Sequence, residues 1–310
     1  MNQKKAGDCL EKIVIIGDGP AGISAALYAA RGNMEPLVIS MGSSALDKAE
    51  LIQNYYGLSK SMTGKELHET GISQARELGV RFMEAQVLGV SGFDTFEIKT
   101  TAGDLEAECV ILATGSQRKT PGIQGLKELE GRGVSYCAVC DAFFYRGKEV
   151  AVLGNGEFAL HEAEELAPMA SKVTICTNGS ALDFSGEAKF PVNTAKIQKI
   201  QGDDQVTGIC FSPEVSAMDT ESAQANILPV AGVFVASGTA GSASIARQMG
   251  AVLTEKGNIQ VNENMESTIP GLFAAGDCTG GLLQVAKAVY EGAKAGLSAV
   301  QYVRTRAREK

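Results

Sequence analysis

The N-terminal part of the chain alternates short apolar runs with a glycine-rich turn and a stretch of helical spacing. A β-branched run at 12–16 predicts a strand, and it leads directly into the glycine-rich segment 17–22. Residues 23–31 then have the pattern of a helix, and 35–40 return as a second apolar strand. A strand, a glycine turn, a helix and a strand within about 30 residues form the βαβ unit that binds dinucleotides.

The glycine-rich segment has the spacing G-x-G-x-x-G, in which each glycine has a separate task. Gly17 makes the tight turn, Gly19 lets the backbone approach a diphosphate, and Gly22 lets the helix pack on its strand. The start of the helix, at Pro20 and Ala21, then faces the phosphates. The alternative that the spacing leaves open is a tight strand-to-helix turn without a ligand.

The same pattern begins again in the middle of the chain. Residues 149–153 have the composition of a strand, 154–159 form a second glycine turn, 160–166 are helical, and 172–176 return as a strand. A chain of 310 residues has room for two domains, because single cores stop growing near about 250–300 residues. The sequence therefore predicts an α/β fold with two Rossmann-like dinucleotide-binding domains.

Other apolar runs end in small or acidic residues. One run leads into the segment 113–115, and a late strand at 271–275 ends in Gly276 and Asp277. An aspartate in that place can hydrogen-bond a cofactor hydroxyl, or it can cap the following helix. We expect that helix to span about 283–303.

Net charge and hydropathy exclude some classes of function. The formal net charge is −8 and the pI is about 5.0, so a nucleic-acid partner is not expected. No apolar run approaches the roughly 18–20 residues of a membrane span, and the first residues lack the apolar region of a signal peptide. We therefore expect no membrane partner and a cytoplasmic location.

Cysteine spacing points to redox chemistry. The chain has seven cysteines, of which only Cys137 and Cys140 lie close together, so a structural disulfide framework is not expected. With two histidines and one CxxC motif, a zinc site would lack ligands, and no metal is expected. A CxxC pair at a helix start favours the thiolate form that exchanges with disulfides. Two unrelated buried cysteines are the alternative.

These segments, in this order, resemble the low-molecular-weight thioredoxin reductase family from about residue 12 to about residue 297. The resemblance is carried by GDGPAG at 17–22, ATG at 113–115, CAVCDAFFYRGKEVAVLGNG at 137–156, GVFVASG at 232–238 and ENMESTIPGLFAAGD at 263–277. A CxxCD motif directly before a second glycine turn is specific to this family.

The resemblance implies a domain layout and an activity. A discontinuous FAD-binding domain is expected at 1–120 and 243–310, with an inserted nicotinamide-type domain at 121–242 that carries the cysteine pair. Members of the family are homodimers. Their inserted domain presents the cysteines alternately to the flavin and to thioredoxin, so FAD is the implied cofactor and thioredoxin the implied partner.

The resemblance also implies roles for single residues. Cys140 is expected to lie nearest the flavin, Cys137 to attack thioredoxin, and Asp141 to supply or take the proton. The residues expected to hold FAD are Gly17, Gly19, Pro20, Ala21, Gly22, Ser40, Asn54, Ala113, Thr114, Gly115, Gly276, Asp277, Gln284 and Val285.

The inserted domain departs from the family where NADPH-dependent members carry a His-Arg-Arg segment. Residues 175–179 read Ile-Cys-Thr-Asn-Gly, and no cation follows before Lys189. A 2′-phosphate needs charge-assisted donors, and the segment also lacks an acid for an NAD ribose. Phe158 is expected to crowd a diphosphate. In these departures the sequence resembles the ferredoxin-linked flavin thioredoxin reductases, which use no pyridine nucleotide.

Reduced ferredoxin is therefore the expected electron donor. A basic patch of Arg118, Lys119, Lys127 and Arg132 would steer an acidic ferredoxin, although the same residues can form an ordinary solvated face. One alternative is an NADPH- or NADH-dependent thioredoxin reductase, and another is a flavin electron-transfer module with a different partner. His68 is expected to be exposed on its helix.

Overall fold

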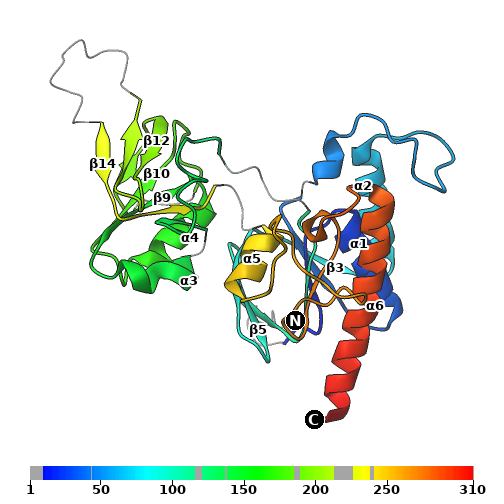
Figure 1. Ribbon diagram of the computed structural model, residues 1–310. Helices are drawn as coiled ribbons and strands as arrows, with labels where there is room; N and C mark the ends of the chain where they lie inside the picture. Colours follow the sequence, from blue (N-terminus) through cyan, green and yellow to red (C-terminus); the bar gives the residue numbers. More distant parts are fainter. Residues whose placement is uncertain are drawn as a thin grey trace, which may run out of the picture. The chain divides into compact units, whose positions relative to one another are not determined.

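The computed structural model describes residues 10–42, 44–115, 121–136, 138–184, 189–212, 226–237 and 241–309, and only the backbone of residues 139 and 140. The chain divides into two compact units (Figure 1). The discontinuous unit comprises Met1–Gln117 and Gly241–Lys310, and the inserted unit comprises Arg118–Ala240.

The discontinuous unit is built on a five-stranded sheet in the order β16-β7-β1-β2-β3, in which each neighbouring pair is parallel. Its strands are β1 (Val14–Ile16), β2 (Leu37–Ser40), β3 (Arg81–Glu84), β7 (Val110–Leu112) and β16 (Leu272–Ala274). All residues of β1, β7 and β16 are buried, as expected for parallel strands that are covered on both faces.

Helices and a second, antiparallel sheet complete this unit. They are α1 (Pro20–Arg31), η1 (Ala45–Lys48), α2 (Gly64–Glu77), β4 (Val87–Ser91), β5 (Phe96–Thr100), β6 (Leu105–Ala107), α5 (Ser242–Gln248), η4 (Asp277–Thr279) and α6 (Val285–Glu309). Helices α1 and α6 lie side by side (Figure 1). Their backbones approach closely, because a Cβ atom on Gly292 would lie 2.1 Å from the carbonyl oxygen of Ala21.

The inserted unit has its own five-stranded parallel sheet, in the order β11-β10-β9-β15-β8. Its elements are β8 (Val134–Ser135), α3 (Ala138–Asp141), η2 (Ala142–Tyr145), β9 (Glu149–Leu153), α4 (Glu157–Leu166), β10 (Lys172–Cys176), β11 (Val192–Asn193), β12 (Ile197–Gln201), β13 (Gly208–Phe211), β14 (Ile227–Pro229) and β15 (Gly232–Val235). Strands β12, β13 and β14 form a small antiparallel sheet.

Each unit therefore contains a βαβ core around a glycine turn, β1-α1-β2 in one and β9-α4-β10 in the other. The predicted fold class is confirmed. Helix α1 begins at Pro20, three residues earlier than the pattern suggested, because proline is well suited to the first position of a helix. None of the helices in the described ranges combines the length and apolarity needed to cross a bilayer.

Candidate functional site

The carboxyl ends of four parallel strands meet at one edge of the sheet in the discontinuous unit. This edge collects most of the residues expected to hold FAD: Gly17 to Gly22 after β1, Ser40 at the end of β2, Ala113, Thr114 and Gly115 after β7, and Gly276 and Asp277 after β16. In open parallel sheets, ligands bind at the carboxyl ends of the strands. The fold thus brings these residues to the place where such a sheet binds a dinucleotide.

The glycine turn after β1 is shaped by close backbone contacts. Gly17 has a φ of 110°, and a Cβ atom there would lie 2.4 Å from the carbonyl oxygen of Ala113. A Cβ atom on Gly22 would lie 1.9 Å from the carbonyl oxygen of Gly17. Gly19 caps α1 without a side chain, so the first-turn N–H groups stay available to a ligand. The turn therefore fits the phosphates of a dinucleotide.

Two of the expected cofactor residues that are far apart in the sequence make direct contact. Asn54 Nδ2 donates a hydrogen bond to Gln284 Oε1 at 3.0 Å across a separation of 230 residues. Gln284 immediately precedes Val285, the first residue of α6. The contact links the loop before α2 to the start of the C-terminal helix.

Ser242 is a residue of this edge that sequence reasoning missed. The Ser242 hydroxyl accepts a hydrogen bond from the backbone N–H of Thr114 at 3.1 Å, and its own N–H donates to Thr114 Oγ1 at 2.8 Å. Ser242 is 1% exposed and begins α5. A serine directly after Gly241 and before an apolar helical pattern was the available signal.

The turn that holds Asp277 is supported by an ion pair that the sequence analysis did not predict. Lys287 and Glu291 form an ion pair at 2.9 Å on α6. Lys287 Nζ also donates to the carbonyl oxygen of Gly276, and the N–H of Gly276 donates to Glu291 at 2.9 Å. Burial raises the pKa of Asp277, an effect that the charge of Lys287 opposes and that of Glu291 reinforces.

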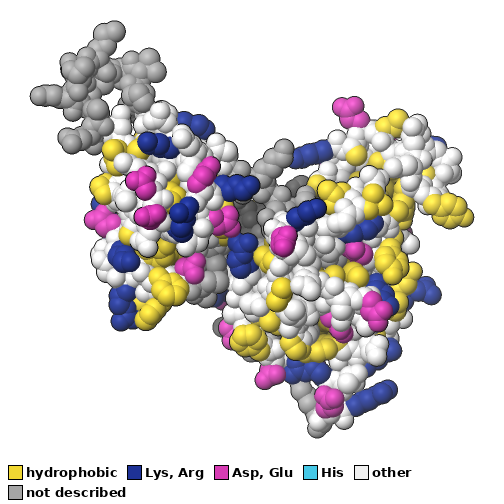
Figure 2. Space-filling model, viewed as in Figure 1, with side chains coloured by type: hydrophobic (Ala, Val, Ile, Leu, Met, Phe, Trp, Pro, Cys, Tyr) yellow, Lys and Arg dark blue, Asp and Glu magenta, His cyan; other side chains and the backbone are white. Residues whose placement is uncertain are grey.

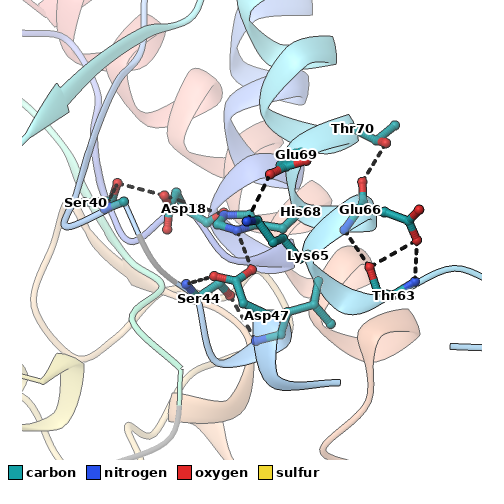
Figure 3. Close-up of polar contacts among 12 residues, drawn as sticks. Asp18, Ser40, Ser44, Asp47, Thr63, Lys65, Glu66, His68, Glu69 and Thr70 are labelled. Atoms are coloured by element: carbon teal, nitrogen blue, oxygen red, sulfur yellow. Dashed lines mark hydrogen bonds and ion pairs between the residues drawn. The ribbon is translucent and has the colours of Figure 1, made fainter. Parts of the chain in front are cut away.

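A buried polar cluster lies directly behind the glycine turn (Figure 3). Asp18, between the first two glycines, is 4% exposed and accepts a hydrogen bond from Ser40 Oγ at 2.8 Å. His68 Nε2 lies 3.0 Å from the carbonyl oxygen of Asp18 and 3.5 Å from its carboxylate, and His68 Nδ1 lies 2.8 Å from Asp47 Oδ1. His68 is 6% exposed, so the expectation of an exposed residue was wrong. Helix α2 turns this side chain inward, toward the glycine turn.

The contacts of His68 fix its charge. Both ring nitrogens face oxygen acceptors, which only the doubly protonated imidazolium can satisfy. The hydrogen bond to Asp18 raises the pKa of His68 to about 9, against the opposing effect of burial. Burial by itself raises the pKa of Asp18, but hydrogen bonds with His68 and Ser40 outweigh it and lower that pKa overall.

The CxxC region of the inserted unit is described in part. Cys137 and the side chain of Cys140 lie outside the described residues. The N–H of Ala138, at the start of α3, donates to Glu162 Oε2 at 2.7 Å, and Ser135 Oγ donates to Asp141 Oδ2 at 2.6 Å. Glu162 is 1% exposed, and burial raises its pKa to about 7. A buried carboxylate thus caps the helix that carries the cysteine motif.

The glycine turn of the inserted unit is covered by its own chain. The N–H of Asp183 donates to the carbonyl oxygen of Asn155 at 2.7 Å, and Asn155 Nδ2 donates to the carbonyl oxygen of Ala181 at 2.8 Å. Gly156 and Asp183 form an isolated parallel bridge. Phe158 is 3% exposed and packs into the interior, so the expectation that it crowds a diphosphate was wrong.

One cation near the end of β10 escaped the sequence reasoning. Lys196, which is exposed, directs its ammonium group to the carbonyl oxygen of Asn178 at 3.4 Å. Asn178 has a φ of 53° and precedes Gly179 in the turn after β10. Lys196 is 20 residues past the end of β10, and β11, which pairs in parallel with β10, brings it back to the turn.

Comparison with known proteins places the chain in a family. Residues 11–292 match the family described as pyridine nucleotide-disulphide oxidoreductase. The chain belongs to this family. It is 34% identical over 308 residues to a thioredoxin reductase of Listeria monocytogenes, a match that covers 94% of this chain and 93% of that protein.

Solved structures that are similar to this chain are also thioredoxin reductases. The atypical thioredoxin reductase TRi from Desulfovibrio vulgaris Hildenborough superposes with a TM-score of 0.87 at 38% identity, covering 95% of this chain and 98% of that one. A ferredoxin-flavin thioredoxin reductase from Clostridium acetobutylicum gives 0.67 at 32% identity, covering 95% and 98%. The chain is an FAD-binding flavoprotein of the thioredoxin reductase type, as the resemblance in its motifs implied.

Proposed function

We propose that this protein is a ferredoxin-dependent thioredoxin reductase. The observation that supports this donor most directly is the covered glycine turn of the inserted unit. The segment 181–183 hydrogen-bonds to Asn155 and bridges to Gly156, on the turn where a pyridine nucleotide would place its diphosphate. A nucleotide would have to displace this segment from the turn.

The chemistry needs two electrons and two protons for each disulfide. Bound FAD would supply the electron pair; the S–S bond between Cys137 and Cys140 would take up that pair and two protons and break to leave a dithiol. In the next step the Cys137 thiolate attacks the thioredoxin disulfide and forms a mixed disulfide. Cys140 then attacks the sulfur of Cys137, which restores the Cys137–Cys140 disulfide and releases reduced thioredoxin. Asp141, positioned by its hydrogen bond from Ser135, exchanges the proton with the cysteine pair.

Thioredoxin docking is supported by two exposed aromatic residues that follow the cysteine motif. Phe143 and Phe144 are 67% and 68% exposed, although Tyr145 of the same turn packs on Phe234 with ring centroids 5.1 Å apart. Hydrophobic side chains gather at the lower edge of the inserted unit, where α3 lies (Figures 1 and 2). An anchored turn that presents two phenylalanines to solvent suits a protein partner.

Replacing both Phe143 and Phe144 with alanine should raise the KM for thioredoxin by about tenfold or more, because aromatic anchors dominate such interfaces. Reduction of the bound flavin by its donor should stay unchanged. Steady-state kinetics with oxidised thioredoxin and stopped-flow flavin absorbance separate the two effects. The control is Phe93→Ala, which removes a phenylalanine that is 69% exposed on the discontinuous unit. An unchanged KM in the double variant would exclude this surface as the docking site.

A nucleotide-dependent reductase is the second candidate, and Lys196 is the observation that favours it. Its ammonium group lies at the turn after β10, where dinucleotide-binding folds read the ribose substituent. One exposed lysine offers less than the bidentate cation cluster that a 2′-phosphate prefers. A flavin electron-transfer module with a partner other than thioredoxin is the remaining alternative, and the cysteine motif disfavours it.

Docking of ferredoxin and assembly of the enzyme belong to the same proposal. Lys127 and Arg132 of the expected basic patch are exposed, whereas Arg118 and Lys119 lie outside the described residues. Basic and acidic side chains are interspersed on the visible face of the inserted unit (Figure 2). We place the FAD-binding domain at 1–120 and 243–310 and the inserted domain at 121–242, in a homodimer.

Anaerobic spectroscopy of the flavin tests the donor. Chemically reduced ferredoxin, NADPH and NADH are added to separate samples, and the visible absorption of the oxidised flavin is followed. The proposal expects bleaching by ferredoxin alone, followed by reoxidation when oxidised thioredoxin is added. Rapid bleaching by NADPH or NADH at low concentration would overturn it in favour of the second candidate, and Lys196→Ala should then weaken the response to NADPH.

A further inference from the structure

The residue between the first two glycines of the FAD turn is a buried aspartate, and its charge has to be compensated. Asp18 is 4% exposed, and it precedes Gly19, the N-cap of α1, where the turn would hold the diphosphate of FAD. A buried carboxylate close to a diphosphate repels it, because both carry negative charge in a region of low dielectric. A ligand-binding turn with this residue therefore needs a cation beside it.

His68 provides that cation and also connects three elements. Its Nε2 atom donates to the carbonyl oxygen of Asp18 at 3.0 Å, and its Nδ1 atom donates to Asp47 Oδ1 at 2.8 Å (Figure 3). Asp47 lies on η1, where its other carboxylate oxygen accepts the N–H of Ser44 at 2.8 Å. The imidazolium therefore links α2, η1 and the glycine turn.

The 3₁₀ helix η1 lies directly against the cofactor turn. A Cβ atom on Gly19 would come within 3.4 Å of Ser44 Oγ, and a Cβ atom on Gly64 would come within 1.8 Å of the carbonyl oxygen of Leu46. The start of α2 and η1 are thus packed backbone to backbone. A change in the charge of His68 therefore acts on the glycine turn through elements that are packed directly on one another.

We propose that Asp18, His68 and Asp47 form a charge-paired clamp that holds the glycine turn in its FAD-binding conformation and cancels the Asp18 charge beneath the cofactor diphosphate. Ser40 supports this clamp by donating a hydrogen bond to Asp18 at 2.8 Å. The inference concerns retention of FAD, so it does not depend on which donor reduces the flavin.

The clamp makes retention of FAD sensitive to pH. The groups that face His68 are Asp18 on the turn and Asp47 on η1. The Ser40 hydroxyl contacts Asp18, and Lys65 and Glu69 of α2 pair with each other at 3.9 Å on the surface. The pKa of His68 is raised from its ordinary value of 6.5 to about 9. The stabilising effect of the cation is therefore complete below about 6.5, and it is lost as the pH rises through about 9.

A double-mutant cycle tests the clamp on the holoenzyme. Glutamine at position 68 keeps a hydrogen-bonding side chain but no charge, and serine at position 18 removes the charge that needs compensation. The rate of FAD release, followed by the fluorescence of free flavin, should rise about tenfold or more in His68→Gln. In the Asp18→Ser background, His68→Gln should change the rate less than about threefold. Equal effects in both backgrounds would mean that His68 merely supports the fold, and the clamp would be excluded.

A second measurement needs no substitution at the clamp. FAD release from the unaltered protein should accelerate when the pH is raised from about 7 to about 10, with a midpoint near the pKa of His68. His161 is the other histidine of the chain, so His161→Gln is the matched control and should show the same pH profile. Release that is independent of pH over this range, or a profile that disappears in His161→Gln, would overturn the proposal.

Discussion

Replacing Cys140 with serine is expected to abolish thioredoxin reduction, with a loss of roughly 10³-fold or more. A serine hydroxyl cannot form the S–S bond that receives the electron pair, so electrons would stay on the flavin. Cys137→Ser should give the same loss, because it removes the sulfur that attacks the thioredoxin disulfide and leaves Cys140 without a disulfide partner. Thioredoxin turnover and the visible absorption of the flavin are the two readouts: the donor should still bleach the flavin, but thioredoxin should neither be reduced nor reoxidise it.

The chain offers a control cysteine in the same unit. Cys210 is buried on β13 and its Sγ atom already donates to Gln201 Oε1 at 3.3 Å, a contact that a serine hydroxyl can keep. Cys210→Ser should therefore retain thioredoxin turnover. If either Cys137→Ser or Cys140→Ser retained turnover as well, electrons would be leaving the flavin by another path, and the disulfide reductase proposal would fail.

Replacing Glu162 with glutamine is expected to stabilise the inserted unit at pH 8 by up to about 3 kcal/mol. Burial raises the pKa of Glu162 from its ordinary value of 4.5 to about 7. Between these values the folded protein binds a proton that the unfolded chain has lost, so stability falls as the pH rises from about 4.5 to about 7. Above about 7 the full cost of a buried carboxylate is present, and glutamine removes it while still accepting the N–H of Ala138.

Hydrogen exchange of the amides of β9 and α4 measures this difference, because it reports the unfolding free energy of the unit itself. At pH 5 the variant and the unaltered protein should agree within about 1 kcal/mol. The control is Glu164→Gln, which removes an exposed pair with Lys189 at 3.0 Å and should cost about 1 kcal/mol or less at either pH. Destabilisation by Glu162→Gln at pH 8 would show that the carboxylate gains more from its contacts than it loses by burial.

The sequence was sufficient for features that depend on neighbouring residues. The spacing Gly17, Gly19, Gly22 predicts the dinucleotide turn, and a Cβ atom on Gly22 would lie 1.9 Å from the carbonyl oxygen of Gly17 within that turn. The CxxC spacing of Cys137 and Cys140 likewise predicts a redox pair from neighbouring residues. Apolar runs with a turn at each end located both βαβ units, and the structure has strands and helices there.

The sequence was insufficient for features that depend on residues far apart in the chain. His68 looked like a surface residue of an amphipathic helix, because its acceptors, Asp18 and Asp47, lie 50 and 21 residues away. Phe158 looked like an obstacle in a turn, since the direction of its side chain is set by the packing of α4. Lys196 lay too far along the chain to be connected with the turn after β10.

Local sequence patterns explain what the sequence determined by itself: the spacing of the glycines, the spacing of the cysteines and the apolar runs each involve only residues near one another in the chain. The tertiary structure decided which charges are buried together. Asp18 meets His68, and Glu162 meets the N–H of Ala138, only after helices and loops have packed on the parallel sheets. Burial sets the protonation of such groups, and burial is a property of the packed chain.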